Sequence, residues 1–178
     1  KASLGNKNVI MYIEKYYPKP KDFESLTILS QLMQSDAIKY AVEAHRRNMP
    51  YCMGTLYWQL NDCWPVASWS SVDYFGNWKA LHYTAKDVFA PISLSQKLDK
   101  NEILSIWMMT DLAEKIQDTL VISIYNIDGK ITRVITEPIN RQVKGSLLIF
   151  SKKIKLDHDQ FIITELKKLK IHSKTLFS

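Results

Sequence analysis

Residues 57–83 mix large aromatic side chains with short polar ones, and this mixture suits the binding of sugars. Four of the five tryptophans of the chain fall within 21 residues: Trp58, Trp64, Trp69 and Trp78. Gln59, Asn61 and Asp62 closely follow the first of them. One face of a pyranose ring consists mostly of C–H groups that rest on an aromatic ring, whereas its hydroxyls need fixed hydrogen-bonding partners. We therefore predict that Trp58 contacts a sugar, with Asn61 and Asp62 as hydrogen-bonding groups beside it.

The other three tryptophans have a simpler interpretation as packing residues that hold the loop against the elements around it. The remaining polar groups of this region also have structural interpretations. Asp73 is expected to stabilise a turn, because aspartate side chains readily bond to nearby backbone amides. His45 and His82 lie on expected helices and are interpreted as packing or surface groups rather than as bases.

The first half of the chain has helical periodicity interrupted by one apolar run. Residues 6–17, 22–48 and 78–88 are expected to be helices, and residues 51–58 form an apolar run of strand length. A helix, a short connection and an apolar strand are typical of a buried parallel strand in an α/β protein. The loop 59–77 follows that strand, where α/β enzymes keep their sites.

From about residue 91 the hydrophobic pattern changes to a period of two, which predicts antiparallel strands. The expected strands are 92–97, 102–110, 118–127, 130–137, 145–155 and 160–168. Asn126–Gly129 is a hairpin signal. Leu120, Ile122 and Ile124 should share one face of their strand, while Val121, Ser123 and Tyr125 share the other. Short strands at regular spacing predict an immunoglobulin-like β-sandwich, with the domain boundary near residues 88–91.

Composition excludes several classes of protein. With 178 residues, 46% of them hydrophobic and 24% charged, the chain is an ordinary globular protein rather than a disordered one. The net charge of +6 is spread widely, and the lysine runs at 152–155 and 167–170 are interpreted as solvated strand faces, so no nucleic-acid partner is expected. Cys52 and Cys63 are expected to be free and buried. No membrane span is expected.

The stretch from Tyr57 to Tyr83, with the pattern YWQLND-WPVASWSS-D-G-WKALHY, resembles the end of the catalytic barrel in family-2 glycoside hydrolases, and the β-mannosidases in particular. Residues 19–25 and 34–48 also match that family. The resemblance implies that residues 1–90 form the C-terminal segment of a (β/α)8 TIM barrel, with 51–58 as its last strand. Residues 91–178 then form an immunoglobulin-like sandwich that need not be complete.

The resemblance also implies a retaining exo-β-mannosidase that removes terminal non-reducing β-D-mannose. It implies that Trp58 helps to form the floor of the sugar-binding subsite, and that Asn61 and Asp62 orient Trp58 or reach the substrate. Such enzymes use two glutamates about 5–5.5 Å apart. The family places them in a Ser-Glu-Phe-Gly-like and an Asn-Glu context, and only Asn101-Glu102 matches the dipeptide, in the wrong domain. The other glutamates are interpreted as solvated charges on helix surfaces or β-domain turns. We therefore assign no catalytic residue and no metal or cofactor to this chain, and we expect it to be inactive alone.

Besides a fragment of a β-mannosidase, two alternative functions remain open at this stage. The Trp-rich loop also fits a non-catalytic carbohydrate-binding or interaction module, and a nucleic-acid binder has only the positive charge in its favour.

The start at Lys1 indicates a piece of a longer protein. An incomplete barrel leaves an apolar edge exposed, and we expect poor solubility, domain swapping or protection of that edge by another copy of the chain. The resemblance leaves the localisation open: periplasmic or secreted for a bacterial protein, lysosomal for an animal one.

Overall fold

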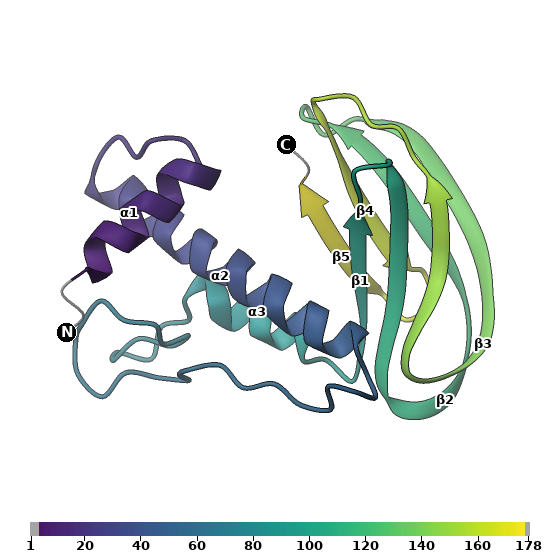
Figure 1. Ribbon diagram of the computed structural model, residues 1–178, viewed down its shortest axis with the longest axis horizontal. Helices are drawn as coiled ribbons and strands as arrows, with labels where there is room; N and C mark the ends of the chain where they lie inside the picture. The colour runs from purple at the N-terminus through teal and green to yellow at the C-terminus, as the bar shows by residue number, and fades with distance from the viewer. Residues whose placement is uncertain (1–3, 177–178) are drawn as a thin grey trace. The chain divides into compact units, whose positions relative to one another are not determined.

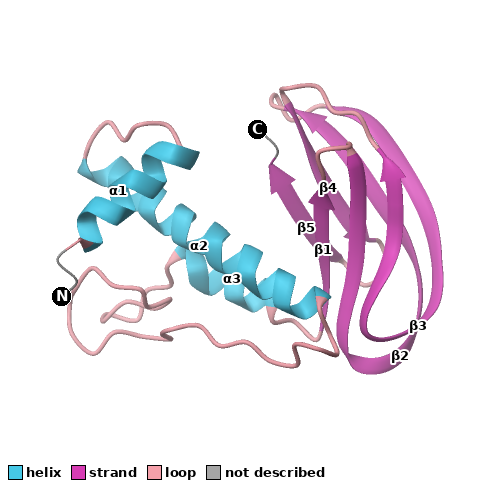
Figure 2. Cartoon of the chain, viewed as in Figure 1, coloured by secondary structure: helices cyan, strands magenta, loops and turns pink. Residues whose placement is uncertain are grey.

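The computed structural model describes residues 4–176, and the chain divides into two units. One unit contains Lys1–Val42 and Thr55–Val88, and the other contains Glu43–Gly54 and Phe89–Ser178. The first holds helices and a long loop, and the second holds all the strands of the described residues (Figure 2). The segment Glu43–Gly54, which includes the last turn of a helix, belongs with the strands.

Three helices form close to their predicted positions: α1 (Gly5–Tyr16), α2 (Phe23–Arg47) and α3 (Ala80–Val88). Asp22 caps α2, because its carboxylate accepts the backbone N–H of Ser25 at 2.7 Å. The basic residues in the last turn of α2 suit the negative end of the helix dipole. No helix among the described residues is both long and apolar enough to cross a membrane.

The predicted strand at 51–58 does not form, although the structure describes all of these residues. A strand exists only where its backbone pairs with a neighbour, and no described strand lies beside this segment. The segment instead runs as an extended loop, drawn in pink in Figure 2. Leu56 is 99% exposed and Trp58 is 73% exposed.

The second unit contains an antiparallel sheet in which β2 and β3 run longer than predicted, whereas β4 is shorter than the predicted 160–168. Its strands are β1 (Ile92–Leu98), β2 (Ile103–Asn126), β3 (Ile131–Lys153), β4 (Gln160–Leu166) and β5 (Ile171–Leu176). The order is β1-β2-β4-β5, with β3 also paired to β2. The predicted strands 102–110 and 118–127 are parts of one strand, β2, and 130–137 and 145–155 are parts of β3. A strand at 171–176 was not predicted.

Strands β2 and β3 stay paired on both sides of an irregularity in their register. Their register shifts between Thr110 and Glu114, opposite Gly145, whose φ of +78° is readily accessible to glycine. The first part of β2 pairs with β1 and the second part pairs with β4. Figure 1 shows β2 and β3 curving together. Because β1 also contacts β5, the sheet nearly closes into a barrel-like domain.

The core of this domain follows the predicted alternation. Leu120, Ile122 and Ile124 are buried together with apolar residues of all the strands from β1 to β4. The hairpin forms at Asn126–Gly129, where the N–H of Gly129 donates to the carbonyl of Asn126 at 3.0 Å. All the lysines of the two basic runs are exposed, as predicted, but only Lys152 and Lys153 lie on a strand. Lys155 follows β3, and the lysines of 167–170 lie in the turn between β4 and β5, so the prediction of strand faces is wrong for them. The cysteines are free, but the prediction that they are buried is wrong: Cys63 is exposed and Cys52 is half-buried.

Candidate functional site

The loop that follows Trp58 is held by backbone hydrogen bonds between segments ten or more residues apart. The N–H of Ser71 donates to the carbonyl of Gln59 at 3.0 Å, and the N–H of Val72 donates to that of Leu60 at 2.8 Å. The N–H of Asp62 returns a bond to the carbonyl of Val72 at 3.2 Å. These bonds place residues 59–62 directly beside residues 71–72, so the start of the loop has a defined position without belonging to a sheet.

A buried carboxylate lies at the centre of the loop. Asp62 is 6% exposed, and its oxygens accept hydrogen bonds from Ser68 Oγ at 2.6 and 2.8 Å and from Ser70 Oγ at 2.6 Å. Lys79 Nζ lies 3.3 Å from Oδ2 of Asp62 and 2.8 Å from Ser70 Oγ. Burial opposes ionisation of Asp62, but the hydrogen bonds from the two serines and Lys79 outweigh it and lower the pKa of Asp62. The four groups form a closed ionic cluster.

A second polar centre is the hydroxyl of Ser71. It donates to the carbonyl of Leu60 at 2.9 Å, and both the hydroxyl of Tyr57 and Nδ1 of His82 lie 3.0 Å away. A serine hydroxyl has one hydrogen and two lone pairs, so Tyr57 and His82 act as donors when that hydrogen points to Leu60. His82 also packs edge-to-face on Trp78, with 4.3 Å between ring centroids.

The three predicted site residues occupy different environments. Trp58 exposes its indole, and the peptide bond that joins it to Gln59 is cis. The side chain of Asn61 is exposed and makes a long contact of 3.4 Å with the carbonyl of Asp62. Asp62 itself is buried within its cluster. The structure therefore leaves Trp58 and Asn61 open to a ligand and encloses Asp62.

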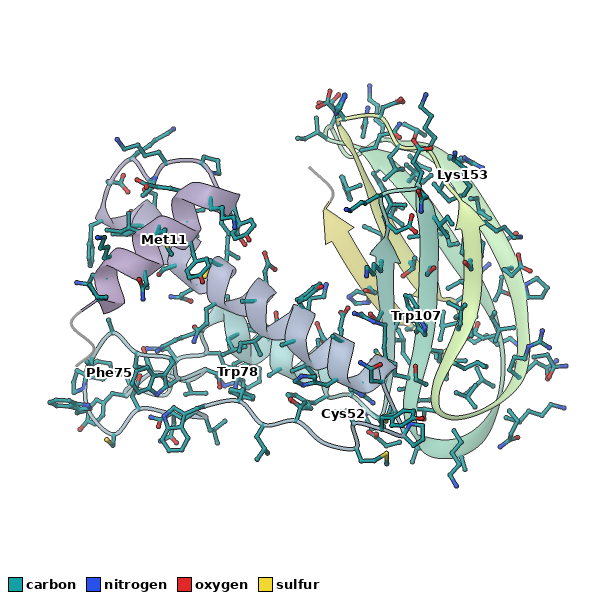
Figure 3. All side chains as sticks on the ribbon, viewed as in Figure 1. Met11, Cys52, Phe75, Trp78, Trp107 and Lys153 are labelled. Carbon is teal, nitrogen blue, oxygen red and sulfur yellow. The ribbon has the colours of Figure 1, made fainter. Side chains whose placement is uncertain are left out.

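Two of the other three tryptophans of the loop differ from the packing prediction. Trp64 is 61% exposed and Trp69 is 58% exposed, so the prediction is wrong for these two, because the described residues of this unit place no covering surface over their rings. The carbonyl of Trp69 nevertheless accepts Gln34 Nε2 of α2 at 2.7 Å, which anchors the backbone. Trp78, labelled in Figure 3, packs on His82 and Tyr83 as predicted.

Asp73 has the turn-stabilising role predicted for it. Its carboxylate accepts the backbone N–H of Phe75 at 2.9 Å and that of Asn77 at 2.8 Å, and the side-chain amide of Asn77 donates at 2.9 Å. The side-chain and backbone hydrogen bonds from Asn77 lower the pKa of Asp73. This turn carries Phe75 at its tip, where Figure 3 labels it.

The structure corrects the prediction that the glutamates are solvated charges on helix surfaces or in turns of the β-domain. Glu43 is not a solvated charge: it is buried, accepts Ser95 Oγ at 2.7 Å and lies 3.6 Å from Arg47. Glu137 and Glu165 lie within strands rather than in turns. Glu137 pairs with a lysine on the strand surface. Among the described residues, no group of three or more histidine, cysteine, aspartate or glutamate side chains is arranged to hold a metal ion.

Sequence reasoning missed Lys79, Ser68, Ser70 and Ser71 as organising residues of the loop. All four lie in the recognised stretch, and the signal available was that three of them are small hydroxyl residues close to an aspartate. Which serine faces the carboxylate depends on the path of the loop, and the sequence pattern does not specify that path.

Comparison with known proteins identifies the class of protein. The chain is 31% identical to the β-mannosidase of Capra hircus over 165 residues, which cover 84% of the chain and 19% of that protein. It is 34% identical to β-mannosidase A of Aspergillus fumigatus over 139 residues, 72% of the chain and 15% of that protein. The crystal structure of β-D-mannosidase from Dictyoglomus thermophilum matches 99% of the chain with a TM-score of 0.81 and 28% identity, over 22% of its own length. No protein-family model matches the chain.

The chain belongs to the family-2 glycoside hydrolases. Within that family these relatives are β-mannosidases, and the chain spans about a fifth of the length of the goat protein (19%) and of the Dictyoglomus protein (22%).

Proposed function

We propose that this chain forms one side of the sugar site of a retaining exo-β-mannosidase, with Trp58 as the surface on which a terminal mannose rests. The observation that carries the proposal is the exposed indole of Trp58, held between two residues that are both bonded to Ser71. An aromatic face beside the exposed amide of Asn61 offers the apolar and polar contacts that a pyranose needs. The identity to β-mannosidases supports mannose as the sugar.

The reaction needs a pair of carboxyl groups that we do not assign among the described residues. Retention requires two carboxyl groups about 5–5.5 Å apart, one as nucleophile and one as acid/base. Glu43, Glu102 and Glu137 each pair with a basic side chain, at 3.6, 3.4 and 2.9 Å. We infer that the catalytic pair lies in the part of a longer enzyme that the relatives have and this chain does not contain. The chain alone is then inactive.

The two parts of the sequence, residues 1–90 and 91–178, receive separate domain assignments. We propose that residues 1–90 are the last segment of a TIM barrel, in which 51–58 becomes a strand once its neighbours are present. We propose that residues 91–178 are an immunoglobulin-like sandwich. The match over 99% of the chain to a β-D-mannosidase structure supports both assignments. The apolar side chains exposed between residues 51 and 60 make self-association of the separate chain the expected behaviour, which light scattering over a range of concentrations measures.

The sugar contact is tested by titrating the chain with mannobiose while following tryptophan fluorescence. We expect weak binding that Trp58→Ala removes and that Trp69→Ala, a change of the same kind at another exposed tryptophan, retains. Binding that survives Trp58→Ala contradicts the assignment of Trp58.

A chromogenic β-mannoside tests the catalytic part of the proposal. We expect no hydrolysis by the chain alone, and hydrolysis would contradict the assignment of the catalytic glutamates to another part of the enzyme. Micromolar binding without hydrolysis, combined with a longer natural protein that is also inactive, would favour a carbohydrate-binding module.

A further inference from the structure

We propose that Asp62 is a positioning residue: together with Ser70 and Lys79 it fixes Ser71, and Ser71 holds both neighbours of Trp58. The proposal rests on the proposed function only in taking Trp58 as the ligand-contacting group. It gives Asn61 and Asp62 different roles: Asp62 positions Trp58, and Asn61 is the polar side chain that faces a ligand.

The geometry argues against a direct contact between Asp62 and a ligand. Oδ1 accepts Ser68 Oγ, and Oδ2 accepts Ser68 Oγ, Ser70 Oγ and Lys79 Nζ, all between 2.6 and 3.3 Å. The side chain of Asp62 is 3% exposed. A ligand hydroxyl would have to displace one of these donors and leave it without its partner in a buried place, which is costly.

Bonds connect this cluster to Trp58 from two directions. Ser70 and Lys79 fix the backbone of Ser71 from both sides, because Ser70 precedes it in the chain and the N–H of Lys79 donates to its carbonyl at 2.9 Å. Ser71 then contacts the residue before Trp58 and the residue after it. Its hydroxyl lies 3.0 Å from that of Tyr57, and its N–H donates to the carbonyl of Gln59 at 3.0 Å.

Charge makes the cluster cooperative. Removing one partner of a buried ion pair leaves the other charge without compensation, whereas removing both leaves a neutral site. Lys79→Met should therefore disturb Ser71 more than Asp62→Asn combined with Lys79→Met. Such a pattern would show that the pair acts as a unit.

The experiment uses the whole chain labelled with 5-fluorotryptophan, with the fluorine resonance of Trp58 assigned through Trp58→Phe. The variants are Asp62→Asn, Lys79→Met, their combination, and Ser70→Ala as a milder change that keeps the charge pair. Asp73→Asn is the matched control, because this carboxylate holds a turn in the same loop without bonding to residues 57–62. Hydrogen exchange of the Ser71 amide is measured on the same samples.

We expect the variants of the cluster to shift or split the Trp58 resonance and the control to leave it unchanged. Protection of the Ser71 amide should fall by about tenfold to a hundredfold in the single variants, because each leaves a buried polar group without its partner. The double variant should lie closer to the natural chain than Lys79→Met does.

Two results would overturn the proposal. One is a Trp58 resonance that stays in place in Ser70→Ala and Asp62→Asn while the Ser71 amide loses its protection, since Asp62 would then stabilise the loop without positioning Trp58. The other is an equal response to Asp73→Asn. Adding mannobiose to the natural chain tests the proposed function separately. A Trp58 resonance that ignores the sugar but responds to Asp62→Asn would refute the sugar contact and leave the positioning role intact.

Discussion

Asp118 anchors the turn between β4 and β5 through its carboxylate, and replacing it should destabilise the strand unit. Oδ1 accepts the backbone N–H of Thr119 at 2.6 Å and that of Lys168 at 2.9 Å, and Oδ2 accepts the N–H of Leu169 at 3.1 Å. The residue is 5% exposed. Asp118→Ala therefore leaves three amide groups without their acceptor at a position that water reaches poorly.

The magnitude follows from that number of amides. A buried donor without its partner costs about 1 kcal/mol or more, so the three together should lower the free energy of unfolding by about 3 kcal/mol. In a unit of this size a loss of about 1 kcal/mol corresponds to about 4–8 °C in melting temperature, so the expected decrease for about 3 kcal/mol is about 12–24 °C. Asp118→Asn keeps one acceptor oxygen and should cost about half as much.

The pH dependence has a defined sign. Burial opposes ionisation of Asp118, but the three backbone hydrogen bonds outweigh it and lower the pKa of Asp118. The ionised carboxylate therefore stabilises the folded unit above the unfolded pKa of about 3.9. This stabilisation decreases as the pH falls below that value and is lost as the pH falls through the lowered pKa of the folded state. The difference between Asp118→Asn and the natural chain should be constant from pH 5 to 7 and shrink in acid.

Urea unfolding followed at Trp107 measures this effect, because Trp107 is the only tryptophan of the strand unit. Asp128→Asn removes the same charge from the exposed hairpin of that unit and should change stability by less than about 0.5 kcal/mol. If Asp118→Ala costs no more than this control, or if the cost is the same at pH 3 and pH 7, the reasoning about the buried carboxylate is wrong.

Three further predictions concern the same unit and use the same unfolding measurement. Arg46→Met should cost about 1–3 kcal/mol, because the buried guanidinium bonds to the carbonyl of Ala90 at 2.9 Å. Asp111→Asn should cost much less, because the side chain of this partner of Arg46 is 60% exposed. Equal costs for the two variants would contradict this. Ile122→Ala should cost about 2–5 kcal/mol, since the side chain is fully buried, and a cost below about 1 kcal/mol would refute its place in the core. Gly129→Ala should cost about 1 kcal/mol through its φ of +80° alone, because no atom lies within 4 Å of an added Cβ, and an unchanged midpoint would count against strain in the turn.

Local patterns were sufficient to predict the elements whose stability comes from neighbours in the sequence. Helix α2 lies within the predicted range 22–48, and the Asn126–Gly129 hairpin and the common face of Leu120, Ile122 and Ile124 follow from spacing alone. The apolar run at 51–58 has the same kind of local signal but forms no strand. Its pairing depends on backbone from elsewhere, and the described residues offer none.

The sequence by itself determined the membership in the family, because the stretch from Tyr57 to Tyr83 has specific residues in a specific order. It also predicted Trp58 as a sugar contact and grouped Asn61 and Asp62 together as its polar partners. Only the tertiary structure decided that Asp62 is enclosed by Ser68, Ser70 and Lys79. The physical reason is that a carboxylate next to an exposed amide serves a ligand or the fold according to which donors the chain brings to it, and those donors come from 6 to 17 residues further along the chain.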